Sequence, residues 1–464
     1  MREDHAKGGL FMKENVSMTF DVPVRGEYDV IVAGGGPAGC TAAIASAREG
    51  KRTLLIEATT ALGGMGTMGL VPTWCPFSDK KKMIYRGLAG EIFVKSRACV
   101  PSVSAGRLDW VPINAEELKR IYDEMVTESG AIVLFQTNLC GVRAENGKAE
   151  AILVSNKQGL SLYKAKVFID CTGDADLALG AGAECEKGNA KGTVQPSTHC
   201  FILANVDTYA YEHQVNDLMH RRDTSDQSMS YLLMKDPELD LIVDTHFCNS
   251  LLAPGTVGFN AGHIFNLDST DPMAVSEALL KGRRIAEQFL RGLKKYAPEA
   301  FANAYIAQTG TLMGIRESRR VVCDYRLTAN DYVNRQSFDD EIGRNSYYID
   351  IHNSIDELDK VKDGTFSPSR FERYGEGESH GIPYRCLTPV GLSNVLVAGR
   401  CIGSDSAMNG SIRVMPPCLV TGEAAGIAAA MACDMDTPDI HAVDVSALQE
   451  NLLRHGAYLH IDQE

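Results

Sequence analysis

The most constraining feature of the sequence is the stretch YDVIVAGGGPAGCTAAIASAREGKRTLLIE, residues 28–57. It reads as an apolar strand, a glycine-rich turn, a helix of small residues and a second apolar strand. Gly34 permits a tight turn, Gly36 lets the backbone approach a pyrophosphate, and Gly39 lets the helix pack closely against the sheet. The stretch therefore predicts a strand–helix–strand unit that binds a dinucleotide.

Two further residues fit this interpretation. Pro37 suits the first turn of the helix, whose free N–H groups and positive dipole end would face phosphates. Glu57 ends the second strand, where a carboxylate can accept hydrogen bonds from a ribose hydroxyl. A glycine-rich turn that only packs against its neighbours would leave the position of Glu57 unexplained.

The composition narrows the class of partners. A net charge of −14 argues against nucleic acid or an anionic membrane, because either needs a basic face. The 13 cysteines form no CxxC pair, so we expect free thiols and neither a disulfide framework nor a metal site. The N-terminal residues lack the apolar segment of a secretory signal, and no stretch is apolar and long enough for a membrane span. We expect a cytoplasmic protein.

The length of 464 residues allows two or three domains. Residues 114–130 have helical spacing with Asn114 as a capping residue, and residues 145–147 form the turn of a strand pair. A long helix is expected to start near Asp271 and Pro272. We expect an N-terminal tail at 1–26, a nucleotide-binding domain in two parts at 27–192 and 385–464, and an inserted substrate or cap domain at 193–384.

The stretch ALGGMGTMG, residues 61–69, places four glycines where backbone would lie against an extended second part of the cofactor. With YDVIVAGGGPAG, VFIDCTGDADLA, GIRESRR, IPYRCL, NVLVAGR and GSIRVMPPCLVTGEAAGIAAA, the chain resembles the bacterial FAD-dependent oxidoreductases. The resemblance implies FAD. No recognisable motif for covalent attachment is present, so a non-covalent cofactor is the default expectation. The resemblance also implies an α/β fold: a Rossmann-like FAD-binding domain of glutathione-reductase type with an inserted α+β substrate domain.

The resemblance also assigns cofactor contacts to residues of this sequence. It places the pyrophosphate at the first glycine turn, the ribose at the end of the second strand, the ribityl chain along the second glycine stretch, and the flavin near the C-terminal segment. The implied cofactor-binding residues are Gly34, Gly36, Pro37, Ala38, Gly39, Glu57, Ala58, Gly63, Gly64, Met65, Gly66, Leu139, Thr172, Gly173, Asp174, Gly399, Arg400, Ile402 and Arg413.

Two departures from the wider pattern are informative. Many flavoproteins of this fold have an aspartate after the glycine of the final strand, where this chain has Arg400. The ribityl contact at this position is therefore open. No second GxGxxG turn follows another strand, so we expect no separate NAD(P)H domain, and the electron donor or acceptor stays unknown.

Hydride transfer to or from a flavin needs a group that handles the accompanying proton, and histidine suits this near neutral pH. The middle region offers five candidate histidines: His199, His246, His263, His352 and His380. The family pattern has a histidine at two of these positions, so we select His352, in an apolar strand-like run with Asp350 on the same face, and His380, on a loop. Each is equally explained as a surface residue or as one hydrogen-bonded within the fold.

Arginines supply the remaining catalytic candidates. Arg316 lies in GIRESRR, which either clamps an anionic group or forms an ion-paired segment between domains. Arg413 either stabilises reduced flavin or contacts the substrate. Cys75, a lone cysteine, is expected to be inert. We assign no metal ligands.

These features predict an enzyme that transfers a hydride between FAD and a small polar organic substrate: an alcohol, an amine or an organic acid. Two alternatives stay open. One is an FAD-binding electron-transfer subunit of a complex, and the other is a biosynthetic enzyme that uses the dinucleotide without redox chemistry. A homo-oligomer is also compatible with the sequence.

Overall fold

The computed structural model describes residues 17–352 and 371–459. Its larger part is built on a seven-stranded sheet in the order β3-β2-β1-β6-β5-β4, with β15 added beside β6. The parallel strands of this sheet are β1 (Val24–Ala33), β2 (Thr53–Ile56), β3 (Ile132–Leu134), β6 (Gly159–Asp170) and β15 (Val395–Val397). The chain is therefore of the mixed α/β class with a parallel sheet, as predicted.

The central strands are parallel because helices cross over between them and cover the sheet. β1 runs into α1 (Pro37–Arg48), which leads to β2, so the predicted strand–turn–helix–strand unit is confirmed. β4 (Asn138–Glu145) and β5 (Lys148–Asn156) instead form an antiparallel hairpin. Asn146 and Gly147 both have positive φ, as a tight hairpin turn requires, which confirms the predicted turn.

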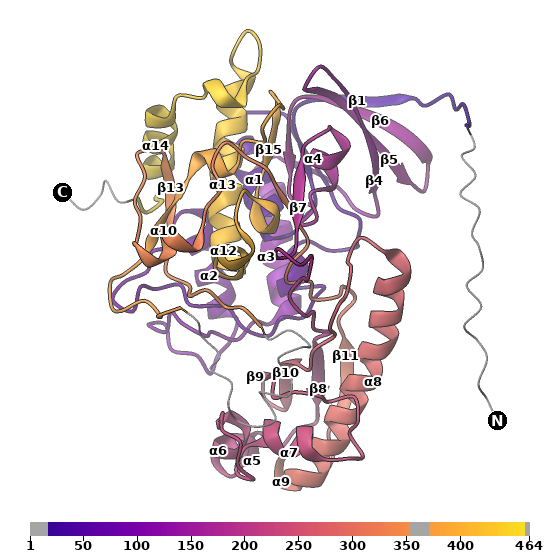
Figure 1. The fold of residues 1–464 in the computed structure, drawn as a ribbon, viewed down its shortest axis with the longest axis vertical. Helices are drawn as coiled ribbons and strands as arrows, with labels where there is room; N and C mark the ends of the chain where they lie inside the picture. Colours follow the sequence, from indigo (N-terminus) through magenta and orange to yellow (C-terminus); the bar gives the residue numbers. More distant parts are fainter. Residues whose placement is uncertain (1–16, 353–370, 460–464) are drawn as a thin grey trace.

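Small residues let two helices approach each other behind the sheet. α13 (Met415–Cys433) packs along α1, and a Cβ on Gly422 would lie 2.1 Å from the carbonyl oxygen of Ala38. Figure 1 shows α13, in yellow, beside α1. Contrary to the expectation that no stretch could span a membrane, α13 is, alone among the described residues, long and apolar enough to cross one, but 94% of the relevant window is buried inside the protein. It is a core helix.

Two of the longer helices begin where the sequence predicts. Asn114 accepts a hydrogen bond from the N–H of Glu117 at the start of α3 (Ala115–Glu128). Asp271 accepts from the N–H of Met273 at the start of α8 (Pro272–Tyr296). The remaining helices are α2 (Leu88–Ala98), α4 (Asp176–Gly180), α5 (Thr208–His213), α6 (Asn216–His220), α7 (Met229–Lys235), α9 (Pro298–Phe301), α10 (Ala329–Val333), α12 (Ser406–Ile412) and α14 (Val445–Arg454), with 3₁₀ turns η1 (Gly64–Gly66), η3 (Tyr384–Cys386), η4 (Gly399–Cys401) and η5 (Ile440–Ala442).

The smaller part of the molecule has its own sheet and its own core. Its antiparallel strands, in the order β11-β8-β10-β9, are β8 (Phe201–Ala204), β9 (Phe247–Ala253), β10 (Thr256–Ala261) and β11 (Tyr305–Thr309). α8 packs on this sheet, where Phe201 stacks on Phe259 and contacts Phe289 with its ring tilted. Figure 1 shows this part below the larger one, with α5 to α9 around its sheet.

Two paired strands mark where the polypeptide leaves the larger part for the smaller one and where it returns. β7 (Cys185–Lys187) pairs antiparallel with β12 (Arg319–Val321), on either side of the smaller part in sequence. The smaller core runs from Phe201 to Met313. Later residues, including β13 (Glu341–Asn345) and β14 (His380–Pro383), pack into the larger core.

Candidate functional site

A cavity of about 810 Å³ lies between the larger sheet and the smaller part. Residues from three glycine turns far apart in the sequence line it, around Gly36, Gly64 and Gly399. A Cβ on Gly64 would lie 3.1 Å from the Cα of Gly36, and one on Gly399 would lie 3.1 Å from the Cβ of Ala38. The three turns therefore meet at one place, next to the N-terminus of α1.

Each glycine of the first turn is required for a different steric reason. Gly34 has φ +95°, and a Cβ there would lie 2.5 Å from the carbonyl oxygen of Cys171. A Cβ on Gly39 would lie 1.7 Å from the carbonyl oxygen of Gly34, so helix and turn can approach only without side chains. Gly36 has nothing within 4 Å of its Cβ position. It is the glycine that leaves room for a ligand at the helix N-terminus.

Glu57 stands at the end of β2, at the edge of the same cavity. Its Oε2 accepts from the N–H of Gly35 at 2.6 Å and its Oε1 accepts from the N–H of Thr59 at 2.7 Å. These bonds fix the carboxylate and leave lone pairs on both oxygens for a ribose hydroxyl.

Arg400 occupies the position where an aspartate is common, and the structure supplies a carboxylate from another segment. Arg400 Nη2 lies 2.6 Å from Asp174 Oδ1, which follows Gly173 in the turn after β6. Asp170, at the end of β6, accepts from the N–H and hydroxyl of Thr172 and so holds this turn. The Nη1 of Arg400 is buried and has no partner among the described residues.

These observations fit an extended flavin nucleotide. The cavity has an open glycine position at a helix N-terminus, a fixed carboxylate for a ribose, and an unpartnered cationic donor at the third turn. A buried guanidinium N–H without an acceptor is costly, and a phosphate or flavin oxygen would satisfy it.

Most residues predicted to bind the cofactor line this cavity: Gly34, Gly36, Pro37, Ala38, Glu57, Ala58, Gly64, Met65, Leu139, Thr172, Gly173, Gly399, Arg400 and Arg413. Five lie behind the lining, namely Gly39, Gly63, Gly66, Asp174 and Ile402. They act through packing or hydrogen bonds: for example, the N–H of Gly63 donates to the carbonyl of Gly35, which joins the first two turns.

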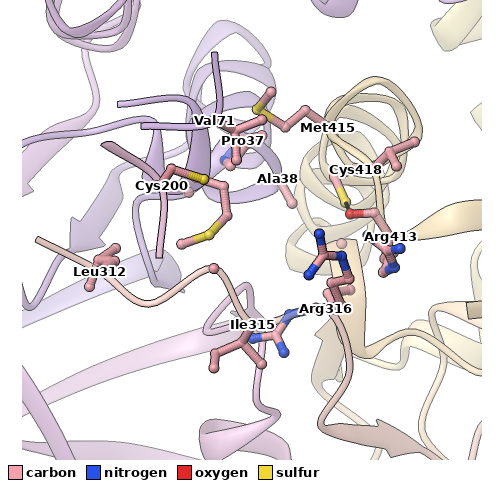
Figure 2. Close-up of a pocket in the computed structure, with 18 of the residues that line it drawn as sticks. Pro37, Ala38, Val71, Cys200, Leu312, Ile315, Arg316, Arg413, Met415 and Cys418 are labelled. Carbon is pink, nitrogen blue, oxygen red and sulfur yellow. Dashed lines mark hydrogen bonds between the residues drawn. The ribbon is translucent and has the colours of Figure 1, made fainter. Parts of the chain in front are cut away.

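The other end of the cavity is apolar on one side and charged on the other. Figure 2 shows Cys200 and Leu312 on one side, and Arg316 and Arg413 together on the opposite side. Cys75 also lines the cavity, but burial raises the pKa of its thiol to about 12. It is therefore a neutral thiol, as predicted for an inert cysteine.

The arginines of the segment GIRESRR fall into two groups: two are ion-paired within the fold, and one faces the cavity. Arg320 pairs with Glu317 of the same segment at 2.6 Å and donates to the carbonyls of Gly188 and Ser404. Arg319 pairs with Asp176 at 2.8 Å, so these two arginines join the segment to its neighbours in the fold. Arg316 instead lines the cavity. Its Nη1 donates to the carbonyl of Pro196 and the hydroxyl of Thr198.

His352 also lines the cavity and is held in a chain of four side chains. Its Nε2 lies 3.3 Å from Asp350 Oδ2, and its Nδ1 lies 2.9 Å from His263 Nε2. His263 Nδ1 in turn lies 2.5 Å from Asp244 Oδ2. The expected proximity of Asp350 and His352 is therefore present, although residues 346–352 lie outside regular strands.

The hydrogen-bonded row of Asp350, His352, His263 and Asp244 lacks one of the protons that its hydrogen bonds require. The row has three contacts, and its two ends are carboxylates, which only accept hydrogen bonds. Three N–H groups are therefore needed, whereas two neutral imidazoles carry two. Burial and the nearby Arg316 lower the pKa of His352 to about 3, and burial lowers the pKa of His263. The pair is thus neutral at neutral pH, and one added proton would complete the third hydrogen bond.

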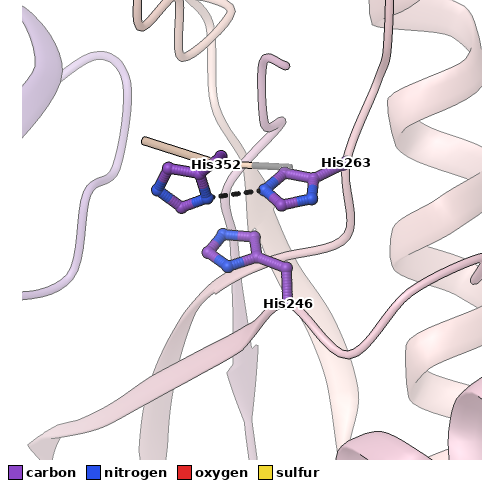
Figure 3. A group of neighbouring side chains, drawn as sticks. All are labelled: His246, His263 and His352. Carbon is purple, nitrogen blue, oxygen red and sulfur yellow. Dashed lines mark hydrogen bonds between the residues drawn. The ribbon is translucent and has the colours of Figure 1, made fainter. Parts of the chain in front are cut away.

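His246 completes a cluster of three histidines, shown in Figure 3, whose ligand atoms lie within 4.8 Å of one another. The rings of His246 and His263 are stacked, with an interplanar angle of 2° and centroids 4.2 Å apart. A metal lies in the plane of each imidazole that binds it, and stacked rings share no such point. Arg316 Nη2 also donates to His246 Nε2 at 3.0 Å. We assign no metal to this arrangement.

The structure does not bring His380 to the cavity. It lies on β14, not on a loop, and is fully buried, with Nδ1 bonded to the hydroxyl of Tyr374 at 2.7 Å. Burial lowers its pKa to about 3. The same hydrophobic core that packs β13 against β14 encloses this histidine, so its place is structural.

Sequence reasoning named His246 and His263 only as members of a wider group. It did not name Gln195, whose buried Nε2 has no partner among the described residues and whose Oε1 faces Arg413. Asp244 was also missed. Both belong to loops whose positions depend on the smaller sheet, and no local pattern marks them.

Comparison with known proteins finds curated relatives that match only part of this chain. A digeranylgeranylglycerophospholipid reductase of Thermoplasma volcanium is 26% identical over 33% of this chain and 42% of its own length. A tRNA uridine 5-carboxymethylaminomethyl modification enzyme of Caldicellulosiruptor saccharolyticus is 26% identical over 32% of this chain and 25% of its own length. The chain thus spans less than half the length of these curated relatives.

A solved structure of a myxobacterial chondrochloren halogenase is 14% identical, with a TM-score of 0.43, and the match covers 92% of this chain and 78% of the halogenase. The family described as FAD dependent oxidoreductase matches residues 29–452. With a flavin-nucleotide cavity in place and nearly the whole chain matched, this protein belongs to the FAD-dependent oxidoreductase family.

Proposed function

We propose that the protein is an oxidoreductase that transfers a hydride between bound FAD and a small polar organic substrate, an alcohol, amine or organic acid. One observation carries this proposal. The glycine turns that fit the nucleotide and the side chains His352, Arg316 and Arg413 line the same cavity. A cofactor and a substrate held in one cavity can exchange electrons directly.

The nucleotide domain is proposed to be of the glutathione-reductase type, with the unit around β8–β11 as the inserted substrate domain. In this arrangement Gly36 and the N-terminus of α1 would hold the pyrophosphate and Glu57 the adenosine ribose. Gly64 and Met65 would lie along the ribityl chain. Bound FAD supplies the two-electron chemistry.

His352 is proposed to hold the proton that leaves the oxygen or nitrogen of the substrate as a C–H bond gives up its hydride. The products are then a C=O or C=N double bond and one proton on the His352–His263 pair. The added proton would complete the hydrogen-bonded chain between Asp350 and Asp244, which supports this uptake, although burial and Arg316 hold the pKa of His352 low. In the reverse direction the same pair donates the proton.

The two alternatives are less well supported. An electron-transfer subunit needs no enclosed group of histidine and arginine beside its flavin, yet Arg316 is only 6% exposed here. A biosynthetic enzyme that uses the dinucleotide as a reagent needs a reactive nucleophile. Desolvation raises the pKa of all five cysteines that line this cavity and makes each a poor one: Cys75, Cys171, Cys200, Cys248 and Cys418.

Anaerobic titration of the purified protein tests the proposal. We expect a yellow protein whose visible absorbance bleaches with a member of a panel of alcohols, amines and organic acids. Bleaching only by a protein partner would favour the electron-transfer subunit. A colourless protein with a bound adenine nucleotide would favour the biosynthetic enzyme.

All 13 cysteines are free thiols, which supports a cytoplasmic location.

A further inference from the structure

Three arginines are buried in the described part of the chain, and one of them differs from the other two. Arg320 is 2% exposed and pairs with Glu317 at 2.6 Å, and Arg344 is 5% exposed and pairs with Glu341 at 2.8 Å. Arg316, 6% exposed, has no carboxylate within ion-pair distance among the described residues. It is also the one of the three that lines the cavity.

The hydrogen-bond partners of Arg316 are all neutral. Nη1 donates to the Pro196 carbonyl and the Thr198 hydroxyl, and Nη2 donates to His246 Nε2 and to Asn260 Oδ1. These bonds use the four N–H groups of the two terminal nitrogens and fix the plane of the guanidinium. They leave Nε–H and the positive charge without an acidic partner.

The nearest acid in the cavity does not cancel this charge. Asp350 is shared: its Oδ2 accepts from the Tyr347 hydroxyl at 3.1 Å and lies 3.7 Å from Arg413 Nη2. Asp244 has both oxygens bonded, to His263 and to the backbone N–H of His246, and lies outside the cavity lining. With the histidines neutral, Arg316 and Arg413 together exceed Asp350 by one charge.

A buried charge without a counter-ion is costly, and burial together with Arg413 lowers the pKa of Arg316 to about 10, so the guanidinium still carries its charge at neutral pH. Such a residue gains most from a ligand that brings the missing negative charge. Arg413, which also lines the cavity, has a buried Nε without a partner in the described chain. A second cationic donor of the cavity therefore lacks an acceptor.

We infer that the substrate carries a carboxylate, that Arg316 is its counter-ion, and that the apolar remainder of the molecule lies against Leu312 and Ile315. This inference rests on the proposed function and names the substrate class for the same cavity. One unmatched positive charge fits a monoanion better than a phosphate dianion. Arg107 and Arg222, exposed at the rim, bond only to backbone carbonyls among the described residues and add attraction for an anion.

Calorimetric titration of the FAD-loaded protein tests the inference. The probes are benzoate and phenylacetate, their uncharged analogues benzamide and phenylacetamide, and inorganic phosphate. We expect at least one carboxylate to bind at least about tenfold more tightly than its amide and than phosphate, as the loss of a charged hydrogen bond predicts. Equal binding of acid and amide, tighter binding of phosphate, or no binding of either carboxylate would overturn it.

Variants locate the binding group. Arg316→Gln should weaken the bound carboxylate by about tenfold or more and leave the amide unaffected. Arg316→Lys, which keeps the charge, should lose less. Arg143→Gln removes a positive charge from the exposed hairpin strand β4 and should change nothing. Unchanged carboxylate affinity in Arg316→Gln would overturn the assignment.

The two proposals fail in different ways. Calorimetry does not depend on electron transfer, so a carboxylate site can be found in a protein whose flavin no small molecule reduces. That outcome would reject the proposed oxidoreductase activity and keep the anion site. A protein reduced only by uncharged alcohols or amines would keep the activity and reject the carboxylate.

Discussion

The Nδ1 atom of His352 lies 2.9 Å from the Nε2 atom of His263, although the two residues are 89 positions apart in the chain. His352 lies on the cavity and His263 lies behind it, bonded to Asp244. This arrangement lets a proton that arrives at the cavity be shared with a buried pair. It also makes the roles of the two histidines separable by mutation.

Replacing His352 should remove the proton acceptor and leave the cofactor in place. In His352→Asn the amide can still donate to His263, but the imidazole that takes up the proton is gone. We expect the rate of flavin reduction by the substrate to fall by about 10²–10⁴-fold, the usual contribution of a general base. Anaerobic stopped-flow absorbance measures this rate. His213→Asn, on the exposed end of α5, is the matched control. Reduction at the wild-type rate would rule out the assigned role.

Asp244 should act as a positioning residue whose effect appears in the pH profile. Its carboxylate raises the pKa of His263, against the effect of burial. In Asp244→Asn the pair should therefore bind a proton less tightly. We expect the rising limb of the rate against pH to move to lower pH and its plateau to fall by about tenfold. Asp244→Glu should restore part of the plateau, and an unshifted limb in Asp244→Asn would contradict this role.

Gly36 offers a test of the nucleotide site that spares the fold. Its φ of −70° is open to alanine, and nothing lies within 4 Å of its Cβ position. A methyl group there would occupy space at the helix N-terminus where the pyrophosphate is expected. Gly36→Ala should keep its unfolding temperature and weaken FAD binding by about 1–3 kcal/mol, the usual cost of overpacking. Equilibrium dialysis of FAD measures this affinity. Gly106→Ala, also in open space, is the control, and unchanged FAD binding in Gly36→Ala would place the pyrophosphate elsewhere.

The sequence predicts well which residues of the glycine turns line the cavity, because the signals are local. The turn from Gly34 to Gly39, the acid Glu57 and the cap Asn114 act within one or two neighbouring elements. Each depends on steric or hydrogen-bonding needs that a short pattern can express.

The substrate half depends on contacts between distant segments. Arg316 meets His246 across 70 positions, and His263 meets His352 across 89. These contacts follow from how β9 and β10 place their flanking loops, which periodicity does not describe. His380 shows the opposite case: a histidine beside glycine suggests a loop, but pairing of β14 with β13 buries it. Residue type alone cannot separate a cavity histidine from a core histidine.

Glu423 gives a prediction for stability and pH. It lies buried on α13, and Leu88 donates its N–H to Oε2 at 3.0 Å, with no cation within ion-pair distance among the residues described. Burial raises the pKa of its carboxyl from 4.5 to about 8. Below pH 4.5 the group is protonated in both the folded and the unfolded chain. Between these values the unfolded chain ionises first, so the folded state loses stability as the pH rises.

Glu423→Gln removes the ionisable group and keeps an oxygen that can accept from Leu88. The variant should therefore be more stable than the wild type at pH 8, by on the order of 1–4 kcal/mol, and nearly equal to it near pH 4.5. Thermal unfolding of the FAD-loaded protein followed by circular dichroism at several pH values measures the difference. Glu128→Gln, at the exposed end of α3, should show no such trend. A stability difference between variant and wild type that stays constant from pH 4.5 to 8 would contradict this prediction. It would mean that the Glu423 carboxyl ionises as easily in the folded protein as in the unfolded chain. The enclosure of this carboxyl between α13 and α2 argues against that outcome.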